Sequence, residues 1–454
     1  MNIKKIKENL CNKFKNKHRS IKKIKKEYLT LKHDDKLNNL KIIGITGSYG
    51  KSTTAVIVHE YLKLVGYKSV LYSSAKIDSP ASIMDDKESC EVAFNSEERL
   101  LGIIEEAEAY EADYLVLEIN ESTIEKGLAN DIPFDIRVLT NLNPKHNLEQ
   151  YSEEKYVNLK KLFFKNINDD CKCVIGLQNY DKELFDEILS LNSYPKYIFT
   201  SDYIATINNV NNYNFTCLLT DLDSSLDGLK MRVMVDGIKY NLETKILMSY
   251  NVLNIVCAMT IAKALNVLDM KKFQECIYDL KIPGRAEVYN YNKRLIVVDT
   301  HLPKMLEGLY SFKEKGLIKK IKVVVGAIGT GFKTWNEKFK SEHFLEQHKI
   351  NKKFCMNLLK KYSDFIYLTE NDNASDSVSD ICIELQGYLD GQVPSVIIED
   401  REQAIREAIK ESEEGDVIFI SGRGNKRTLC NSYSTMKLLK DSEVVEEVLK
   451  EIGW

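Results

Sequence analysis

The 454-residue sequence lacks several features that would assign it to a specialised class of protein. No run of about 18 apolar residues offers a membrane-spanning helix. The N-terminus has basic residues without an apolar core behind them, so we expect no signal peptide. The ten cysteines are scattered singly except for Cys171 and Cys173, whose close and isolated spacing does not suggest a zinc site. We therefore expect reduced thiols and a cytoplasmic location.

The composition is that of an ordinary globular protein. Hydrophobic residues make up 44% of the chain and charged residues 29%, which are both near the averages of soluble domains. A chain of this length can form two or three domains, each with its own core. No internal repeat or long low-complexity linker interrupts the sequence.

The charge is distributed unevenly along the chain. Residues 1–40 hold 13 Lys/Arg against 4 Asp/Glu, a net +9, so the rest of the chain carries −12 of the total of −3. Apolar residues recur in this basic arm at near-helical spacing and predict an amphipathic helix. The arm either packs on the body through its apolar stripe or contacts a membrane surface or an anionic substrate.

From Lys41 onward, short apolar runs alternate with helical patterns. Lys41–Ile45 reads as a buried strand, and Ser52–Leu64 follows it as a helix. Such alternation predicts a mainly parallel sheet covered by helices. After a β-rich stretch near 197–240 and an apolar helix near 252–265, Pro283 and Gly284 suggest a hinge. The alternation then restarts as a second α/β unit with strands at 295–298, 321–325, 365–368, 395–398 and 417–420.

A Gly-containing segment joins the first strand to the first helix. It reads Thr46-Gly47-Ser48-Tyr49-Gly50-Lys51-Ser52-Thr53. Such a segment offers a phosphate close backbone N–H groups, a helix N-terminus, a lysine ammonium and a hydroxyl for Mg²⁺. Ile45 stands where a strict Walker A loop has its first glycine. The strand–turn–helix context nevertheless predicts a nucleotide site made by Gly47, Ser48, Gly50, Lys51, Ser52 and Thr53.

The short spacing of this loop, together with later motifs in the same order, resembles the Mur ligase family, closest to its MurE branch. Glu118 ends an apolar run, as the family's Mg²⁺-binding glutamate does. The segment Thr140–His146 resembles the family's Thr-Asn-Leu…Asp-His segment, whose histidine helps to hold a second metal ion. Tyr156 and Lys160 follow His146 at the MurE-like separations, and the resemblance implies a carbamoylated Lys160, an anion that can orient Mg²⁺ where an ammonium cannot.

The resemblance continues through the second half of the chain. Asn251 and Asn254 match the family's nucleotide-contacting asparagines. The segment Pro283–Val288 resembles the Pro-Gly-Arg-x-Glu hinge, whose arginine, Arg285 here, reaches the ATP phosphates. The segment Val298–Pro303 resembles Asp-Tyr-Ala-His-x-Pro with one residue fewer, which makes Asp299 a nucleotide contact. Near the end, Glu399–Arg401 and Gly422–Lys426 resemble two further MurE-like segments.

Some substrate motifs depart from the family pattern. About 40 residues precede the phosphate loop, where ligases of UDP-linked substrates carry a uridine-binding domain of many tens of residues. The segment Phe94–Glu97 replaces the Thr-Thr-Pro segment that holds the muramoyl peptide, and Lys145 replaces an acidic residue. On the acceptor side, Asp372 and Asn373 match the diaminopimelate-selecting motif without its arginine, and Lys426 replaces a glutamate. Lys426 disfavours a second ammonium on the acceptor, and hence favours a neutral or acidic one.

The family resemblance implies an α/β fold with a P-loop parallel-sheet ATPase domain at 41–281, a smaller Rossmann-like domain at 282–454 and the arm at 1–40. It implies a ligase that uses ATP and Mg²⁺ to join a carboxylate donor to an amino acid through an acyl phosphate, in peptidoglycan precursor synthesis. Lys51, His146 and Lys160 would be catalytic; Ser52 with Glu118, and His146 with Lys160, would hold two Mg²⁺ ions; Asp372, Asn373 and Lys426 would bind the acceptor. No nucleic-acid partner is expected. The alternatives are a ligase for a poly-γ-glutamate-, folate- or pseudomurein-type substrate, and an ATP-binding scaffold subunit.

Overall fold

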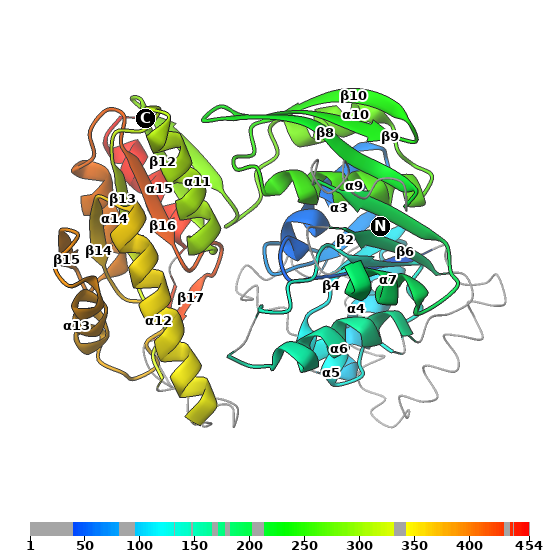
Figure 1. The fold of residues 1–454 in the computed structure, drawn as a ribbon, viewed down its shortest axis with the longest axis horizontal. Helices are drawn as coiled ribbons and strands as arrows, with labels where there is room; N and C mark the ends of the chain where they lie inside the picture. Colours follow the sequence, from blue (N-terminus) through cyan, green and yellow to red (C-terminus); the bar gives the residue numbers. More distant parts are fainter. Residues whose placement is uncertain are drawn as a thin grey trace.

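A computed structural model describes residues 40–80, 96–130, 132–146, 149–165, 171–177, 182–201, 213–330, 342–430, 436–438 and 440–453. The basic arm before Leu40 and the residues Phe94 and Asn95 of the donor segment therefore lie outside the described residues. Two α/β units stand side by side and meet along one face (Figure 1). None of the helices in the described ranges has the length and apolar character needed to cross a membrane.

The first unit is built on a ten-stranded sheet with the order β10-β9-β8-β7-β6-β5-β1-β4-β2-β3. From β2 to β8 through β4, β1, β5, β6 and β7, neighbouring strands are parallel, whereas β3, β9 and β10 are antiparallel additions at the two edges. The strands are β1 (Lys41–Thr46), β2 (Ser69–Tyr72), β3 (Ile77–Asp78), β4 (Tyr114–Glu118), β5 (Ile136–Leu139), β6 (Lys172–Gly176), β7 (Lys196–Thr200), β8 (Phe215–Ser225), β9 (Gly228–Val235) and β10 (Ile238–Thr244).

Helices cover both faces of this sheet, which explains why its central strands are almost entirely apolar. On one face, α3 (Lys51–Leu64), α9 (Asn251–Ala264) and α10 (Met270–Tyr278) share a core with the strands. The other face is covered by α4 (Glu97–Ala109), α5 (Glu121–Glu125), α6 (Glu153–Lys165) and α7 (Lys182–Ser190). Because β1 and β4 are parallel neighbours, their carboxyl ends meet at one edge of the sheet, and this edge carries Thr46 and Glu118.

The second unit has a six-stranded sheet with the order β11-β12-β16-β13-β14-β15, in which only β11 is antiparallel. Its strands are β11 (Glu287–Tyr291), β12 (Arg294–Asp299), β13 (Ile321–Val325), β14 (Phe365–Leu368), β15 (Ser395–Ile397) and β16 (Val417–Ser421), followed by the hairpin β17 (Thr428–Cys430) and β18 (Met436–Leu438). One face packs on α11 (Leu302–Glu314), α12 (Glu342–Tyr362) and α13 (Val378–Leu389), and the other on α14 (Arg401–Lys410) and α15 (Asp441–Glu451).

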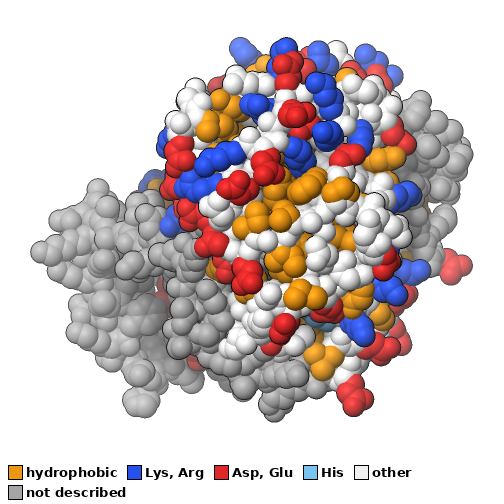
Figure 2. Space-filling model, turned by 90° about the vertical axis from the view of Figure 1, so that its left-hand side faces the viewer, with side chains coloured by type: hydrophobic (Ala, Val, Ile, Leu, Met, Phe, Trp, Pro, Cys, Tyr) orange, Lys and Arg blue, Asp and Glu red, His pale blue; other side chains and the backbone are white. Residues whose placement is uncertain are grey.

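The outer face of this second unit is seen in Figure 2, where hydrophobic side chains lie among charges of both signs. The helices α12 and α13 contribute exposed apolar side chains, among them Phe354 and Ile383. The described part of the chain gives no indication of what would cover them.

The predicted α/β class is confirmed, and the predicted strand runs agree with the observed strands to within a residue or two. The β-rich stretch near 197–240 proves to hold β7 to β10, in which β7 and β8 continue the parallel part of the first sheet and β9 and β10 are its antiparallel edge. The sequence pattern did not reveal β11 or the β17–β18 hairpin, whose alternating polar residues give a weak apolar signal.

Candidate active site

The phosphate loop lies between β1 and the N-terminus of α3, as its sequence predicts. Gly50 caps the helix in a left-handed conformation with φ 78°, and a Cβ there would lie 1.9 Å from the Asn254 side-chain oxygen. Glycine is thus required at this position both by φ and by the close approach of α9. The Lys51 ammonium folds back over the loop and donates to the Gly47 carbonyl at 2.9 Å.

The Thr140–Asn141 pair forms the scaffold of this loop. The Asn141 amide accepts from Tyr49 N–H at 3.0 Å and donates to the Tyr49 carbonyl at 2.8 Å, and Thr140 Oγ1 donates to the same carbonyl at 2.7 Å. Both side chains are buried. These contacts explain why a segment 90 residues away in sequence is needed to shape the loop.

Glu118 and Ser52 meet at the edge of the sheet, together with Ser74, which the sequence analysis did not single out. Glu118 Oε2 accepts from Ser74 N–H at 2.9 Å and from Ser74 Oγ at 3.1 Å, and Ser74 Oγ lies 2.8 Å from Ser52 Oγ. A carboxylate beside hydroxyl oxygens is the donor set that Mg²⁺ prefers, so the residues fit the first predicted metal position. Ser74 lies in the turn after β2, where the sequence offers no motif.

Lys160 is fully buried in α6, and its ammonium donates to Thr46 Oγ1 at 2.8 Å and to Glu121 Oε1 at 2.6 Å. Burial lowers the pKa of Lys160 to about 8, although Glu121 opposes the shift. Burial alone would raise the pKa of Glu121, but the Lys160 and Lys51 charges outweigh it and lower the pKa to about 2. The sequence analysis missed Glu121, whose only signal was a second acidic residue three positions after Glu118.

His146 lies beside this ion pair. Its ring contacts the Tyr49 and Tyr156 rings edge to face, with centroids 4.6 and 5.6 Å apart, and Tyr156 donates to Ser48 Oγ at 2.8 Å. Burial, with help from the Lys51 charge, lowers the pKa of His146 to about 4. The imidazole is therefore neutral at physiological pH, with a nitrogen lone pair free for a metal ion. These residues fit the second metal position provided that an anionic oxygen joins them.

The second α/β unit reaches across to this edge. Arg285 Nη2 lies 3.4 Å from Ser52 Oγ and 3.2 Å from Ser74 Oγ. Asp299 is buried, and its carboxylate accepts from Ala286 N–H at 2.8 Å and from His301 N–H at 2.6 Å. Asp299 therefore holds the Arg285 turn and the start of α11 together.

The two units enclose a cavity of about 310 Å³. The lining includes most of the predicted nucleotide residues, Ser48, Gly50, Lys51, Ser52, Thr53, Asn251, Arg285 and Asp299, as well as Glu118, His146 and the unpredicted Ser74 and Lys304. Asn251 belongs to the frame, because its amide donates to the Leu247 carbonyl at 2.7 Å and accepts from Asn254 at 2.9 Å. Gly47 and Lys160 are not part of this lining.

The cavity carries an excess of positive charge. Its three cationic side chains, those of Lys51, Arg285 and Lys304, have no ion-pair partner within 4 Å among the described residues. Lys304 is instead placed over the Tyr49 ring, 4.9 Å from its centroid. Unpaired cations that converge beside a helix N-terminus are suited to a polyphosphate.

The predicted acceptor residues form a separate cluster in the second unit. The buried Asp372 carboxylate lies 2.9 Å from Arg423 Nη1, forms an ion pair with Lys426 and accepts from Cys430 N–H at 3.0 Å. Asn373 donates to the Asp376 carbonyl at 2.7 Å. None of Asp372, Asn373 and Lys426 lines the cavity, and an acceptor-binding role for them stays a prediction.

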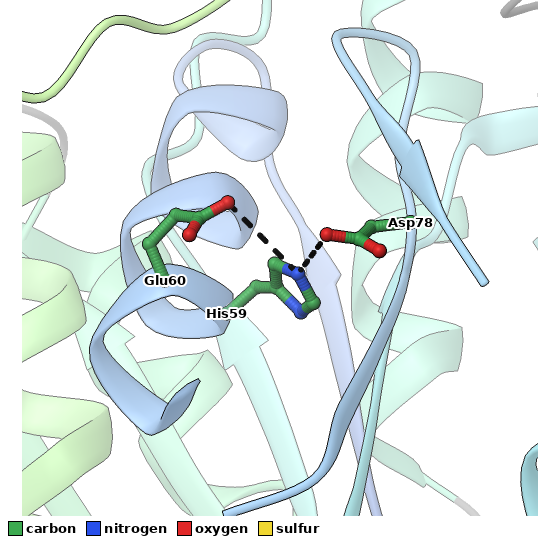
Figure 3. Close-up of side chains that lie close together, drawn as sticks. All are labelled: His59, Glu60 and Asp78. Carbon is green, nitrogen blue, oxygen red and sulfur yellow. Dashed lines mark hydrogen bonds and ion pairs between the residues drawn. The ribbon is translucent and has the colours of Figure 1, made fainter. Parts of the chain in front are cut away.

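Another group of potential metal ligands lies at the β3 edge of the first sheet (Figure 3). His59 Nε2 is 2.9 Å from Asp78 Oδ2 and 4.0 Å from Glu60 Oε1. Lys76 lies 2.6 Å from Glu60 and 3.1 Å from Asp78, and Lys63 lies 2.9 Å from Asp78. These two ammonium groups already neutralise both carboxylates, so the cluster ties β3 to α3 and does not need a cation.

Comparison with known proteins matches both units. Residues 45–262 match the family described as "Mur ligase middle domain", and residues 284–424 match "Mur ligase, glutamate ligase domain". A relative from Geobacillus kaustophilus, named UDP-N-acetylmuramoyl-L-alanyl-D-glutamate--2,6-diaminopimelate ligase, is 22% identical over 92% of this chain and 80% of its own.

Two solved structures from Thermotoga maritima have the same fold. A MurF ligase in complex with ADP has a TM-score of 0.59 at 17% identity, covering 96% of this chain and 84% of its own. A folylpolyglutamate synthase has a TM-score of 0.58 at 16% identity, covering 89% of this chain and 90% of its own.

Proposed function

The chain belongs to the Mur ligase family, and from this premise we propose that it is a MurE-like, ATP-dependent ligase of cell-wall peptide precursors. It joins a substrate carboxylate to an amino acid amine and releases ADP and phosphate. The observation that carries the proposal is the cavity between the units, in which Lys51, Arg285 and Lys304 converge without ion-pair partners among the described residues. Three cations suit the triphosphate of ATP and the carboxylate that attacks it.

The first chemical step is phosphoryl transfer. A carboxylate oxygen of the donor attacks the γ-phosphorus, the bond to the β-phosphate oxygen breaks, and ADP leaves with the electron pair. Lys51 and the loop N–H groups on one side and Arg285 and Lys304 on the other would hold the phosphates while negative charge accumulates. Two anions must be brought together in this step, which explains the need for positive charge from both units.

The second step is acyl transfer. The amine nitrogen of the acceptor attacks the acyl carbon, the carbon–oxygen bond to phosphate breaks, and phosphate leaves with the electron pair. The nitrogen loses one proton, to the departing phosphate or to water. Water would hydrolyse the acyl phosphate, so the site must be shielded. Arg285, the last residue of the Ile282–Arg285 turn, contacts Ser52 beside the phosphate loop, and Asp299 supports it by accepting from Ala286 N–H. Closure of the second unit about this turn would exclude water.

We propose two positions for Mg²⁺, whose charge would neutralise the phosphates and the attacking carboxylate when it is bound. Ser52 and Glu118 would hold one ion. His146 would contribute to the other, together with Lys160 if that lysine is carbamoylated. The lowered pKa of Lys160 supports such a modification, because a share of its amine is neutral near pH 8 and able to react with carbon dioxide.

The acceptor we propose is an amino acid without a second ammonium group. Asp372, which matches the aspartate of the family's acceptor motif, is already paired with Arg423 and Lys426. A diaminopimelate-like side chain would therefore meet net positive charge at this cluster. A neutral or acidic amino acid would not.

The first experiment is mass spectrometry of the product made from ATP, a UDP-N-acetylmuramoyl dipeptide donor and a pool of amino acids. A mass equal to donor plus one amino acid minus water supports the proposal and names the acceptor. Release of ADP without this product would instead favour the second candidate, a folate- or polyglutamate-type or pseudomurein-type ligase, for which the folylpolyglutamate synthase fold is the supporting observation.

A third candidate is a scaffold subunit that binds ATP without turnover. Phosphate release that depends on an added acceptor would exclude it.

We also propose a cytoplasmic location, which the eight described cysteines support because all of them are free thiols. Membrane-surface contact through residues 1–40 stays a prediction outside the described residues.

A further inference from the structure

The second metal position contains a carboxylate that the family motifs do not assign. Glu121 is the first residue of α5, which follows β4 and is capped by Asn120. Its side chain is 10% exposed, and its Oε1 lies 2.6 Å from the Lys160 ammonium, which is 0% exposed. An ammonium in such a place requires a partner, since an unpaired buried charge is strongly destabilising. The folded chain therefore supplies its own anion next to Lys160.

Glu121 is also linked, through Lys160, to the phosphate loop and to His146. The Lys160 ammonium donates to Thr46 Oγ1 at 2.8 Å, at the start of the phosphate loop, and lies 5.3 Å from the centroid of the Tyr156 ring. That ring contacts the His146 ring, with centroids 5.6 Å apart. Glu121 is thus linked to His146 through Lys160 and Tyr156, whereas Glu118 is linked to Ser52 through Ser74. Imidazole nitrogen and carboxylate oxygen are both ligands for a divalent cation, whereas an ammonium is not.

A carbamate on Lys160 would alter this balance of charge. The pair of Lys160 and Glu121 has no net charge as it stands, and carbamoylation would exchange it for two adjacent buried anions. The ion pair and its hydrogen bond would be lost at the same time. Because Glu121 already provides the anionic oxygen that the carbamate would provide, the modification is not needed for this site to bind a cation.

We propose that Glu121 is the carboxylate ligand of the second Mg²⁺ position, and that Lys160 is an unmodified ammonium that holds and neutralises it. This inference rests on the proposed function and replaces the carbamate in it. His146 and Glu121 are then the protein ligands of the second ion, and Lys160 is a positioning residue.

The decisive experiment counts metal ions in wild type and single variants. Mn²⁺ is titrated by electron paramagnetic resonance in the presence of a non-hydrolysable ATP analogue. Wild type should bind two ions; Glu121→Gln should weaken the second at least tenfold and leave the first unchanged; Lys160→Met should keep both. Glu125→Gln is the matched control, since Glu125 lies on the same helix, pairs with Lys155 at 2.6 Å and should have no effect.

The opposite pattern would overturn the proposal: loss of the second ion in Lys160→Met with retention in Glu121→Gln identifies a carbamate as the ligand. A single ion in wild type would overturn it as well. Glu121→Gln leaves Lys160 unpaired and can misfold, so the double variant Glu121→Gln/Lys160→Met, which buries no charge, is measured in parallel. It should fold, bind the nucleotide with one Mn²⁺ and lack the second ion; two ions in this variant would refute the role of Glu121.

A carbon-13 spectrum of wild type in labelled bicarbonate gives a readout that does not involve metal. No carbamate signal is expected, and a signal that disappears in Lys160→Met would contradict the inference. The proposed function is judged separately by the ligation product, so a wild type that makes product but shows the opposite metal pattern fails the inference alone.

Discussion

Lys304 is the cation of the cavity that lies over an aromatic ring. It lies on the first turn of α11, is exposed to the cavity and is placed over the Tyr49 ring. Partial burial lowers the pKa of Lys304, which an anionic ligand would reverse. Lys304→Met should raise the KM for ATP roughly tenfold, or about 1.4 kcal/mol, the lower range for a charge-assisted hydrogen bond. Initial rates at varied ATP measure it.

The control for this variant is Lys315→Met. Lys315 caps the other end of α11, away from the cavity, so removal of its charge changes the same helix without touching the site. The KM for ATP of Lys315→Met should match that of wild type. If Lys304→Met also keeps the wild-type KM, Lys304 does not bind the nucleotide.

His146 predicts a pH dependence of stability. Its pKa is about 4 in the folded protein and about 6.5 in an unfolded chain. Between these values the unfolded state binds more protons, so the stability contributed by neutral His146 is present above pH 6.5 and is lost as the pH falls toward 4. From pH 7.5 to 5.0 this loss amounts to about 2 kcal/mol in the free energy of unfolding.

A His146→Gln variant should lack that part of the loss. Urea denaturation at the two pH values measures it, and the comparison with wild type cancels the similar effect of His301, whose pKa burial also lowers to about 4. Equal losses in both proteins would mean that His146 is not desolvated as the structure describes.

Sequence reasoning found those site residues whose role depends on their neighbours in the chain. Glu118 ends β4 and Lys51 begins the helix that follows β1, two positions where a parallel sheet is expected to carry chemistry. Ser74 and Glu121 were missed because their significance depends on partners 22 and 39 residues away, Ser52 and Lys160. Arg401, noted as part of a motif, is buried in an ion pair with Asp441 at 2.8 Å, a contact that no sequence pattern predicts.

Two glycines in connecting segments should differ in their tolerance of a side chain: Gly284 in the turn between the two units, and Gly316 after α11. Gly284 and Gly316 both adopt left-handed conformations, with φ 67° and 73°. A Cβ on Gly284 would lie 2.2 Å from the Asn425 backbone nitrogen, whereas one on Gly316 would meet nothing within 4 Å. Gly284→Ala therefore combines backbone strain with a clash and should cost about 2–4 kcal/mol in the free energy of unfolding, and Gly316→Ala about 1 kcal/mol.

Activity should separate the two variants further. Asn425 donates across the boundary to the Ala75 carbonyl at 2.5 Å, next to Ser74. Displacement of the Asn425 loop by Gly284→Ala should lower kcat/KM, while Gly316→Ala should leave it unchanged. Denaturation and steady-state kinetics on the same samples test both statements, and equal effects of the two variants would contradict the close approach at Gly284.

The elements themselves were largely predictable, because buried parallel strands are nearly continuous in apolar residues. The runs Lys41–Thr46, Tyr114–Glu118 and Val417–Ser421 are examples. The extent of the first sheet was not predictable. The long hairpin strands β8 to β10 alternate buried and exposed residues, and the sequence does not tell whether they extend the parallel sheet or form one of their own.

For the whole molecule, the nucleotide site is divided between two units that contact each other beside it. Arg285 reaches Ser52, Asn425 reaches Ala75, and the His301 ring meets the Tyr49 ring with centroids 5.1 Å apart. These three contacts lie beside the cavity, whereas Asn351 and His348 of α12 meet Glu149 of the first unit elsewhere. The phosphates of ATP would enter between cations from both units. Because Lys51 belongs to one unit and Arg285 and Lys304 to the other, a bound triphosphate should draw the units together about the Ile282–Arg285 turn.

Small-angle scattering should therefore show a smaller radius of gyration when a non-hydrolysable ATP analogue and the carboxylate donor are added together. The control is Arg285→Ala/Lys304→Met, which keeps the phosphate loop and Lys51 but removes both cations of the second unit. This variant should still bind the analogue, more weakly, and keep the radius of the free protein. Only the second unit loses charge in this variant. If the variant compacts as much as wild type, closure does not depend on phosphates held by both units. If the radius of gyration of wild type does not change, closure itself is excluded.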